Sequence, residues 1–171
     1  MNPIISFFQQ QLRDEAEITR KMLRIVPADR FEWQPHPKSM SLVRLSTHVA
    51  EVLSWIPIAI ETDELDFKNG GYKQPVIKNV PQLLAYFEQN VVDAEAALTS
   101  TDDATLQQTW TMRGGDVIYA VMTRGEMIRV SFSQLIHHRA QLGVFLRLLD
   151  LPIPGSYGPS ADEMQISEVT A

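Results

Sequence analysis

The chain contains 171 residues, with 15 basic and 21 acidic side chains and a formal net charge of −6. This length fits one domain with a sizeable hydrophobic core, and the acidic balance argues against a nucleic-acid partner or an anionic membrane surface. There is no apolar run of the roughly 18 residues that a membrane span needs and no signal-peptide pattern, so a cytoplasmic location is expected.

Four segments have the apolar spacing of amphipathic helices. The first starts at Asn2, the expected N-cap, with Pro3 in its first turn, and Pro27 ends the run. The second begins after Ser41, and Pro57 is expected to kink or end it, because proline removes a backbone donor and clashes with the preceding turn.

The third helix is predicted from Asn79, and the fourth is opened by a capping box from Thr123 to Glu126. Between them, residues 106–122 break the helical period and alternate around two glycines, which predicts a short hairpin. The predicted fold is therefore an all-α four-helix bundle with a hairpin-like insertion between the third and fourth helices. Residues 1–160 are expected to form this single domain, and 161–171 a flexible tail.

The absence of cysteine narrows the chemistry. Disulfides, thiolate metal ligands and a cysteine nucleophile are excluded, so any thiol must come from a co-substrate. The four histidines are His36, His48, His137 and His138. His36 lies between two prolines and is expected in a surface loop.

A helical wheel places the other candidate residues. His48 lies on the boundary between the core and a cleft, while Gln134 and His138 share one flank of the fourth helix and His137 points away. A boundary histidine is more often packed and hydrogen-bonded than a metal ligand, and polar pairs four residues apart are common on helices. The residues alone therefore leave a ligand site and a structural role both open.

Arg139 lies near the centre of the apolar stripe of the fourth helix. Because an unpaired buried guanidinium is costly, Arg139 is expected to be buried and paired with a carboxylate of the first helix, such as Asp14 or Glu17.

Three stretches of the chain together resemble the DinB-like superfamily of small metalloproteins. They are Trp33-Gln34-Pro35-His36-Pro37-Lys38-Ser39-Met40-Ser41-Leu42 with Leu45 and Thr47-His48-Val49-Ala50-Glu51, then Ile136-His137-His138-Arg139-Ala140-Gln141-Leu142, and Pro152-Ile153-Pro154-Gly155-Ser156-Tyr157-Gly158-Pro159-Ser160. The resemblance implies a DinB-like four-helix bundle with a divalent metal ion at one end of a cleft.

In this family, one histidine of the second helix and an H-x-x-x-H pair of the fourth typically bind the metal. His48 and His138 match the first and last positions, and Gln134 stands at the middle one. The implied metal site is therefore His48, Gln134 and His138, holding Zn, Ni or Fe more weakly than three imidazoles would.

The resemblance also implies an activity and partners. Characterised relatives resemble metal-dependent transferases or isomerases that use low-molecular-weight thiols such as mycothiol or bacillithiol, a hydrolase being a further reading, and some relatives form homodimers. The alternative is a non-catalytic small-molecule-binding or dimeric scaffold with a degenerate metal site. His137 and Glu51 would be general bases only if their helices turned them inward, which the wheel disfavours.

Overall fold

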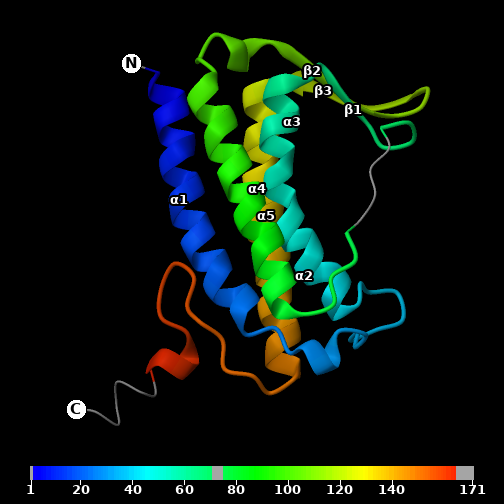
Figure 1. The fold of residues 1–171 in the computed structure, drawn as a ribbon, viewed down its shortest axis with the longest axis vertical. Helices are drawn as coiled ribbons and strands as arrows, with labels where there is room; N and C mark the ends of the chain where they lie inside the picture. Colours follow the sequence, from blue (N-terminus) through cyan, green and yellow to red (C-terminus); the bar gives the residue numbers. More distant parts are fainter. Residues whose placement is uncertain (1, 71–74, 165–171) are drawn as a thin grey trace.

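The computed structural model describes residues 2–70 and 75–164 and is built on five α-helices. These are α1 (Pro3–Arg24), α2 (Leu42–Glu51), α3 (Trp55–Glu61), α4 (Val80–Ser100) and α5 (Arg124–Leu148). A 3₁₀ turn, Val52–Ser54, joins α2 to α3, and the two helices run end to end as one column of the bundle (Figure 1). The five helices therefore make the four columns that the sequence predicts.

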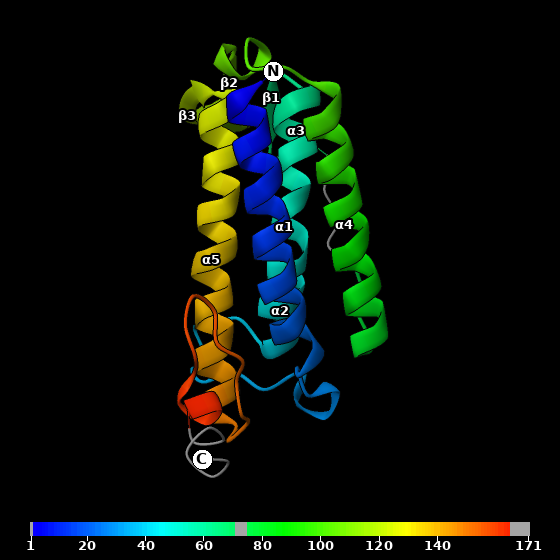
Figure 2. The same ribbon diagram turned by 90° about the vertical axis from the view of Figure 1, so that its left-hand side faces the viewer.

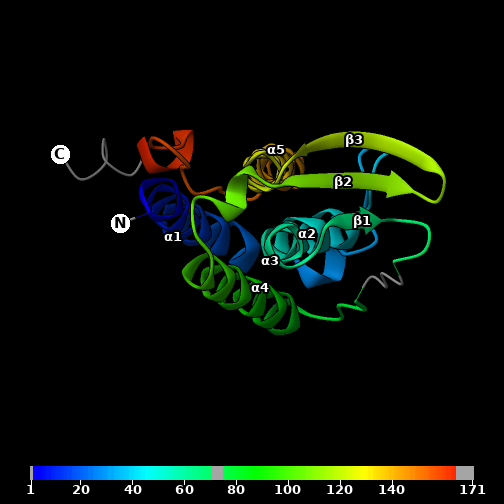
Figure 3. The ribbon, with the colours of Figure 1, turned by 90° about the horizontal axis from the view of Figure 1, so that it is seen from above.

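The columns enclose one hydrophobic core. Seen from above, α1, α4, the α2–α3 column and α5 surround a common axis (Figure 3), and α1 packs against α4 and α5. Leu12, Val49, Phe87, Phe132 and Leu142 are among the fully buried side chains of this core. None of the helices in the described part of the chain combines the length and apolarity that a membrane crossing needs.

The break in the second predicted helix lies just upstream of Pro57. Pro57 is the third residue of α3, and the 3₁₀ turn at Val52–Ser54 precedes it. Proline cannot donate to the carbonyl of Leu53, four residues earlier, and its ring pushes against that carbonyl. The turn before proline is a 3₁₀ turn, so the helix is interrupted at this place, but it resumes instead of ending.

A small sheet at one end of the bundle corrects the all-α prediction. Strands β2 (Thr109–Gly114) and β3 (Val117–Thr123) form the expected antiparallel hairpin, and β1 (Glu64–Asp66) pairs in parallel with β2. The hairpin projects away from the helices (Figures 1 and 3). A strand of three residues is too short to show an alternating pattern, and for this reason β1 was not predicted.

The first turn of α1 is capped by a distant residue. Asn2 occupies the N-cap position, as expected, but its side chain makes no capping hydrogen bond. Instead, the carboxylate of Asp103 accepts hydrogen bonds from the backbone N–H groups of Ile4 and Ile5, at 3.2 and 3.0 Å. A negative charge is favourable at a helix N-terminus, where the backbone donors are otherwise unpaired.

Arg139 is buried, with 1% of its surface exposed, and it joins three segments of the chain. Its guanidinium donates to Oε2 of Glu15 at 2.6 Å, to the hydroxyl of Thr19 at 3.0 Å and to the hydroxyl of Tyr157 at 2.9 Å. Tyr157 in turn donates to Oε1 of Glu15 at 2.7 Å. The expected pairing with α1 is confirmed, but the carboxylate belongs to Glu15 and not to Asp14 or Glu17.

The segment after α5, residues 152–164, is here called the C-terminal strap, and it runs back along α1 and α5 (Figure 2). The first four residues of the predicted tail, 161–164, form a helical turn. In that turn Asp162 accepts hydrogen bonds from the Arg147 side chain and from the backbone N–H of Ile153. Residues 165–171 of the predicted tail lie outside the described residues.

We expect the hold of the strap on α5 to weaken in acid. The hydrogen bond and charge of Arg147 lower the pKa of Asp162 to about 2, below the ordinary value of about 3.9. A carboxylate whose pKa is lower in the folded than in the unfolded state stabilises the fold at pH values above the unfolded-state pKa. This contribution disappears as the pH falls from about 4 to 2. Asp162→Asn should therefore lower the melting temperature at pH 6 but not at pH 2, whereas an equal deficit at both pH values would contradict this assignment.

Candidate metal and ligand site

The α2–α3 column and α5 bring His48 and His138 together. Their ring centroids are 4.5 Å apart and the ring planes lie at 69° to each other. Both side chains are partly buried, and the indole ring of Trp55 lies 6.2 Å from the His48 ring. The expectation that the two histidines meet is confirmed.

Each histidine is held through its Nδ1 atom by a neighbour on its own helix. Nδ1 of His48 lies 2.6 Å from Oε1 of Glu51, and Nδ1 of His138 lies 2.8 Å from Oε1 of Gln141. Carboxylate and amide oxygens accept hydrogen bonds, so both Nδ1 atoms carry the proton and both Nε2 atoms present a lone pair. Metal-ligating histidines usually have their second nitrogen held in this way.

The environment of His138 keeps its ring neutral. Burial lowers the pKa of His138 most, the hydrogen bond to Gln141 acts in the opposite direction, and the nearby charges of His48, His137 and Arg44 lower it further. A pKa below the ordinary value of about 6.5 leaves the imidazole uncharged at neutral pH. The neutral form is the one that binds metal ions.

Gln134 lies one turn before His138 on α5 and is half-buried. Side chains four residues apart share one side of a helix, so the amide belongs to the flank that carries His138. Within residues 2–70 and 75–164, no group of three or more His, Cys, Asp or Glu side chains could hold a metal ion. Of the described residues, the structure thus brings together two imidazoles, those of His48 and His138, without a third ligand of these four types.

The site contains two further residues. The sequence analysis did not identify Arg44, and it placed Glu51 on the outer side of its helix. Glu51 is buried, with 5% of its side chain exposed, and its Oε1 accepts from Nδ1 of His48 and from Nη1 of Arg44, the latter at 3.3 Å. The wheel was therefore wrong to turn Glu51 outward, because Arg44 and His48 on the same side of α2 contact its carboxylate and it is buried there. The spacing of residues 44, 48 and 51, by four and three, is the signal that could have found both.

An apolar pocket opens beside His48. It has a volume of about 170 Å³, and its apolar wall is formed by Trp55, Ile58, Leu65 and Phe67. Arg44, His48 and Glu51 form the polar side of the same pocket. A cavity of about 150 Å³ can hold a benzene molecule, so this pocket is large enough for a small ring or a branched alkyl group. His137 is exposed and does not line it, although its ring lies 4.8 Å from that of His138.

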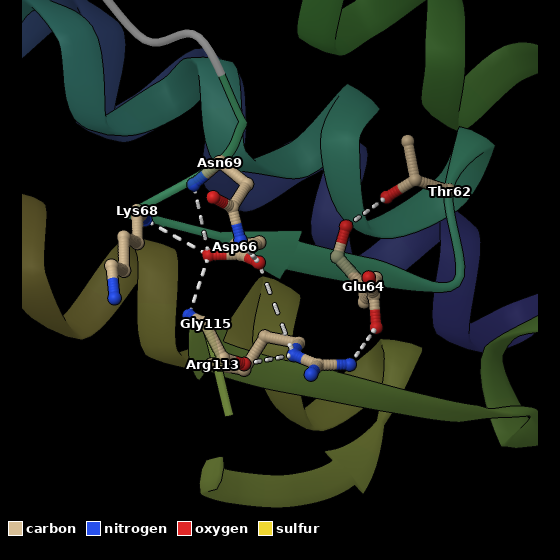
Figure 4. A network of polar contacts seen from close by, with 7 residues as sticks. All are labelled: Thr62, Glu64, Asp66, Lys68, Asn69, Arg113 and Gly115. Carbon is tan, nitrogen blue, oxygen red and sulfur yellow. Dashed lines mark hydrogen bonds and ion pairs between the residues drawn. The ribbon is translucent and has the colours of Figure 1, made fainter. Parts of the chain in front are cut away.

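Asp66 fixes the part of the sheet that supplies Leu65 and Phe67 (Figure 4). Its Oδ1 accepts hydrogen bonds from the backbone N–H groups of Lys68, Asn69 and Gly115, at 2.9, 3.1 and 2.9 Å. These bonds, that from Gly115 above all, lower the pKa of Asp66 well below its usual range. The carboxylate therefore ties the end of β1 to the turn of the β2–β3 hairpin.

We expect Asp66→Ala to loosen this wall of the pocket without unfolding the bundle. The three backbone donors would lose their common acceptor, so amide hydrogen exchange should accelerate at Lys68, Asn69 and Gly115. Asp116→Ala is the matched control, because Asp116 is an exposed residue of the same turn. Equal exchange rates in the two variants would show that Asp66 does not anchor β1.

The fold and the paired histidines define a class of small helical-bundle proteins. Residues 11–142 match the family model of the DinB superfamily, and the chain belongs to this family. It is 24% identical over 161 residues to the uncharacterized protein YrdA of Bacillus subtilis (strain 168), across 93% of this chain and 91% of that protein.

Solved structures of DinB-like proteins have the same fold. The protein YjoA of Bacillus subtilis superposes with a TM-score of 0.68 at 16% identity, across 91% of this chain and 98% of that one. A DinB-like protein from Bacillus cereus ATCC 10987 gives a TM-score of 0.67 at 21% identity, with 88% and 95% covered. The chain therefore has the overall fold of these DinB-like proteins.

Proposed function

We propose that this protein binds a divalent transition-metal ion between α2 and α5 and uses it on a small molecule held in the adjacent pocket. The observation that carries the proposal is the contact between His48 and His138, whose ring centroids are 4.5 Å apart and whose Nδ1 atoms are both held by acceptors. His48 and His138 would hold the ion through Nε2, with Gln134 in or beside the coordination sphere. Zn, Ni and Fe suit such nitrogen and oxygen donors.

A bound metal ion would supply a Lewis acid that lowers the pKa of a thiol or water bound to it. Glu51 keeps His48 in the tautomer that presents Nε2 and places a buried negative charge next to the site. The hydrogen bond to Gln141 keeps His138 in the same tautomer, and burial lowers the pKa of His138 and so favours its neutral form. With His48, His138 and Gln134 as its protein ligands, such an ion would also be able to bind a small molecule.

The reaction that fits best is transfer or isomerisation with a low-molecular-weight thiol. The chain has no cysteine, so the thiol must be brought by a co-substrate, and the family resemblance implies such a molecule. The apolar pocket beside His48 would receive the electrophilic partner. A thiol on the metal ion and an electrophile in the pocket would then lie next to each other.

A metal titration tests the proposal. Untagged protein treated with a chelator should bind one Zn²⁺ or Ni²⁺ ion per chain by calorimetry, and His48→Ala or His138→Ala should weaken binding by at least about tenfold. His36→Ala is the control, because His36 lies exposed in a loop and its Nδ1 accepts a local backbone hydrogen bond from Lys38. Unchanged affinity in His48→Ala would overturn the proposed site.

A second candidate function is a non-catalytic small-molecule-binding scaffold. It is favoured by the donor set, since the described residues include no third His, Cys, Asp or Glu ligand and Gln134 stands where the family has histidine. Pocket binding without a metal requirement in the same titrations would select this candidate over the enzyme.

A further inference from the structure

We propose that the pocket beside His48 takes a small organic anion, with its carboxylate on Arg44 and an apolar group of about the size of a benzene ring between Trp55 and Phe67. This inference rests on the proposed function, because it names the class of molecule that the same site would act on. It depends on the guanidinium of Arg44 and on the apolar wall of the pocket.

Arg44 has unused hydrogen-bonding capacity at the polar end of the pocket. Its side chain is 36% exposed, and among residues 2–70 and 75–164 the guanidinium has one hydrogen-bonded partner, Oε1 of Glu51 at 3.3 Å. An arginine carries five N–H donors in a rigid fork that matches the two oxygens of a carboxylate. A contact through one nitrogen leaves most of this fork available to a ligand.

The charge of Glu51 does not exclude an anion from the pocket. The oxygen of Glu51 that faces Arg44 also accepts the 2.6 Å hydrogen bond from His48, and the carboxylate is almost completely buried. Its negative charge is therefore already matched by an N–H donor and a cation. A ligand carboxylate would approach the outer, exposed side of Arg44, away from this contact.

The rest of the pocket selects for an apolar body. Trp55, Ile58, Leu65 and Phe67 present ring and alkyl surface, and apolar surface removed from water stabilises a complex in proportion to its area. The volume of about 170 Å³ is close to that of a cavity that holds one benzene molecule. A larger ring system would not fit without moving β1.

The test uses three probes that share one phenyl ring and differ in their polar group: phenylacetate, phenylacetamide and 2-phenylethylamine. Chelator-treated wild-type protein should bind phenylacetate at least about tenfold more tightly than the amide, and the ammonium probe most weakly. Arg44→Gln should remove the preference for phenylacetate, and Arg44→Lys, which keeps the charge but not the fork, should restore part of it. Equal binding of carboxylate and amide, or no binding of any probe, would overturn the inference.

A matched control separates a local effect from a general loss of positive charge. Arg20→Gln removes an arginine that pairs with Glu88 away from the pocket, and it should leave the affinities of all three probes unchanged. If Arg20→Gln reduced phenylacetate binding as much as Arg44→Gln, the anion would not be bound at Arg44, and the inference would fail.

The anion site and the metal site can be separated by His138→Ala, which removes a proposed metal ligand that does not line the pocket. Arg44-dependent binding of phenylacetate by this variant would support the anion site even where the metal titration fails. Conversely, binding that appears only with Zn²⁺ and persists in Arg44→Gln would place the carboxylate on the metal. That result would overturn the anion site and leave the metal proposal standing.

Discussion

Arg139→Met should be the most destabilising single substitution that the structure identifies. It would leave the carboxylate of Glu15 buried without its cation, and such a loss typically costs about 3–5 kcal/mol. For a chain of this size, about 1 kcal/mol shifts the melting temperature by roughly 2–4 °C, so a decrease of roughly 10 °C is expected. Thermal unfolding followed by circular dichroism would measure it.

Two further variants show whether the cause is the buried charge. Arg147→Met on the same helix breaks a partly exposed pair with Asp162, and exposed pairs are worth only about 0–1 kcal/mol. The double variant Glu15→Leu/Arg139→Met removes both charges and should be more stable than Arg139→Met alone. An Arg139→Met protein that melts within about 2 °C of wild type would show that this network contributes little.

Gln134→His should tighten metal binding by at least about tenfold, or roughly 1.4 kcal/mol. The substitution supplies a third imidazole one turn from His138, on the same side of α5. Imidazole is a stronger ligand than an amide oxygen for Zn²⁺ and Ni²⁺. Calorimetric titration of both proteins after removal of metal would give the ratio of affinities, and wild-type protein should lose its metal more readily on dialysis.

Ser133→His is the matched control for this gain. Ser133 is the neighbouring position on α5, but it is exposed and its hydroxyl donates to the carbonyl of Arg129. A histidine there should leave the affinity unchanged, and His48→Ala should abolish the gain from Gln134→His. Equal affinities of wild type and Gln134→His would mean that residue 134 does not face the metal ion.

The parts of the fold that depend on local chemistry could be predicted from the sequence. Asn79 caps α4 by accepting from the N–H of Gln82, and Thr123 and Glu126 form the expected capping box of α5. The cap of α1 could not be predicted, because its acceptor, Asp103, lies about a hundred residues away in the chain. The pairing of β1 with β2 is likewise a long-range contact without a local pattern.

In the candidate site, too, some residues could be predicted from the sequence and others could not. His48 and His138 could be placed together because each lies at a core boundary on helices that must pack. Glu51 escaped prediction because a wheel centred on the apolar stripe does not show its polar contacts with Arg44 and His48. Phe67 could not be assigned to the pocket without β1, whose position depends on the hairpin far along the chain.

The network around Arg139 affects the order in which the chain can fold during its synthesis on the ribosome. Glu15 on α1 is synthesised before its partners Arg139 and Tyr157, which follow 124 and 142 residues later. At about 5–20 residues per second, the nascent helix waits on the order of ten seconds for them. During this interval Glu15 has no buried cation as a partner, so we expect its carboxylate to stay in water until Arg139 has been synthesised.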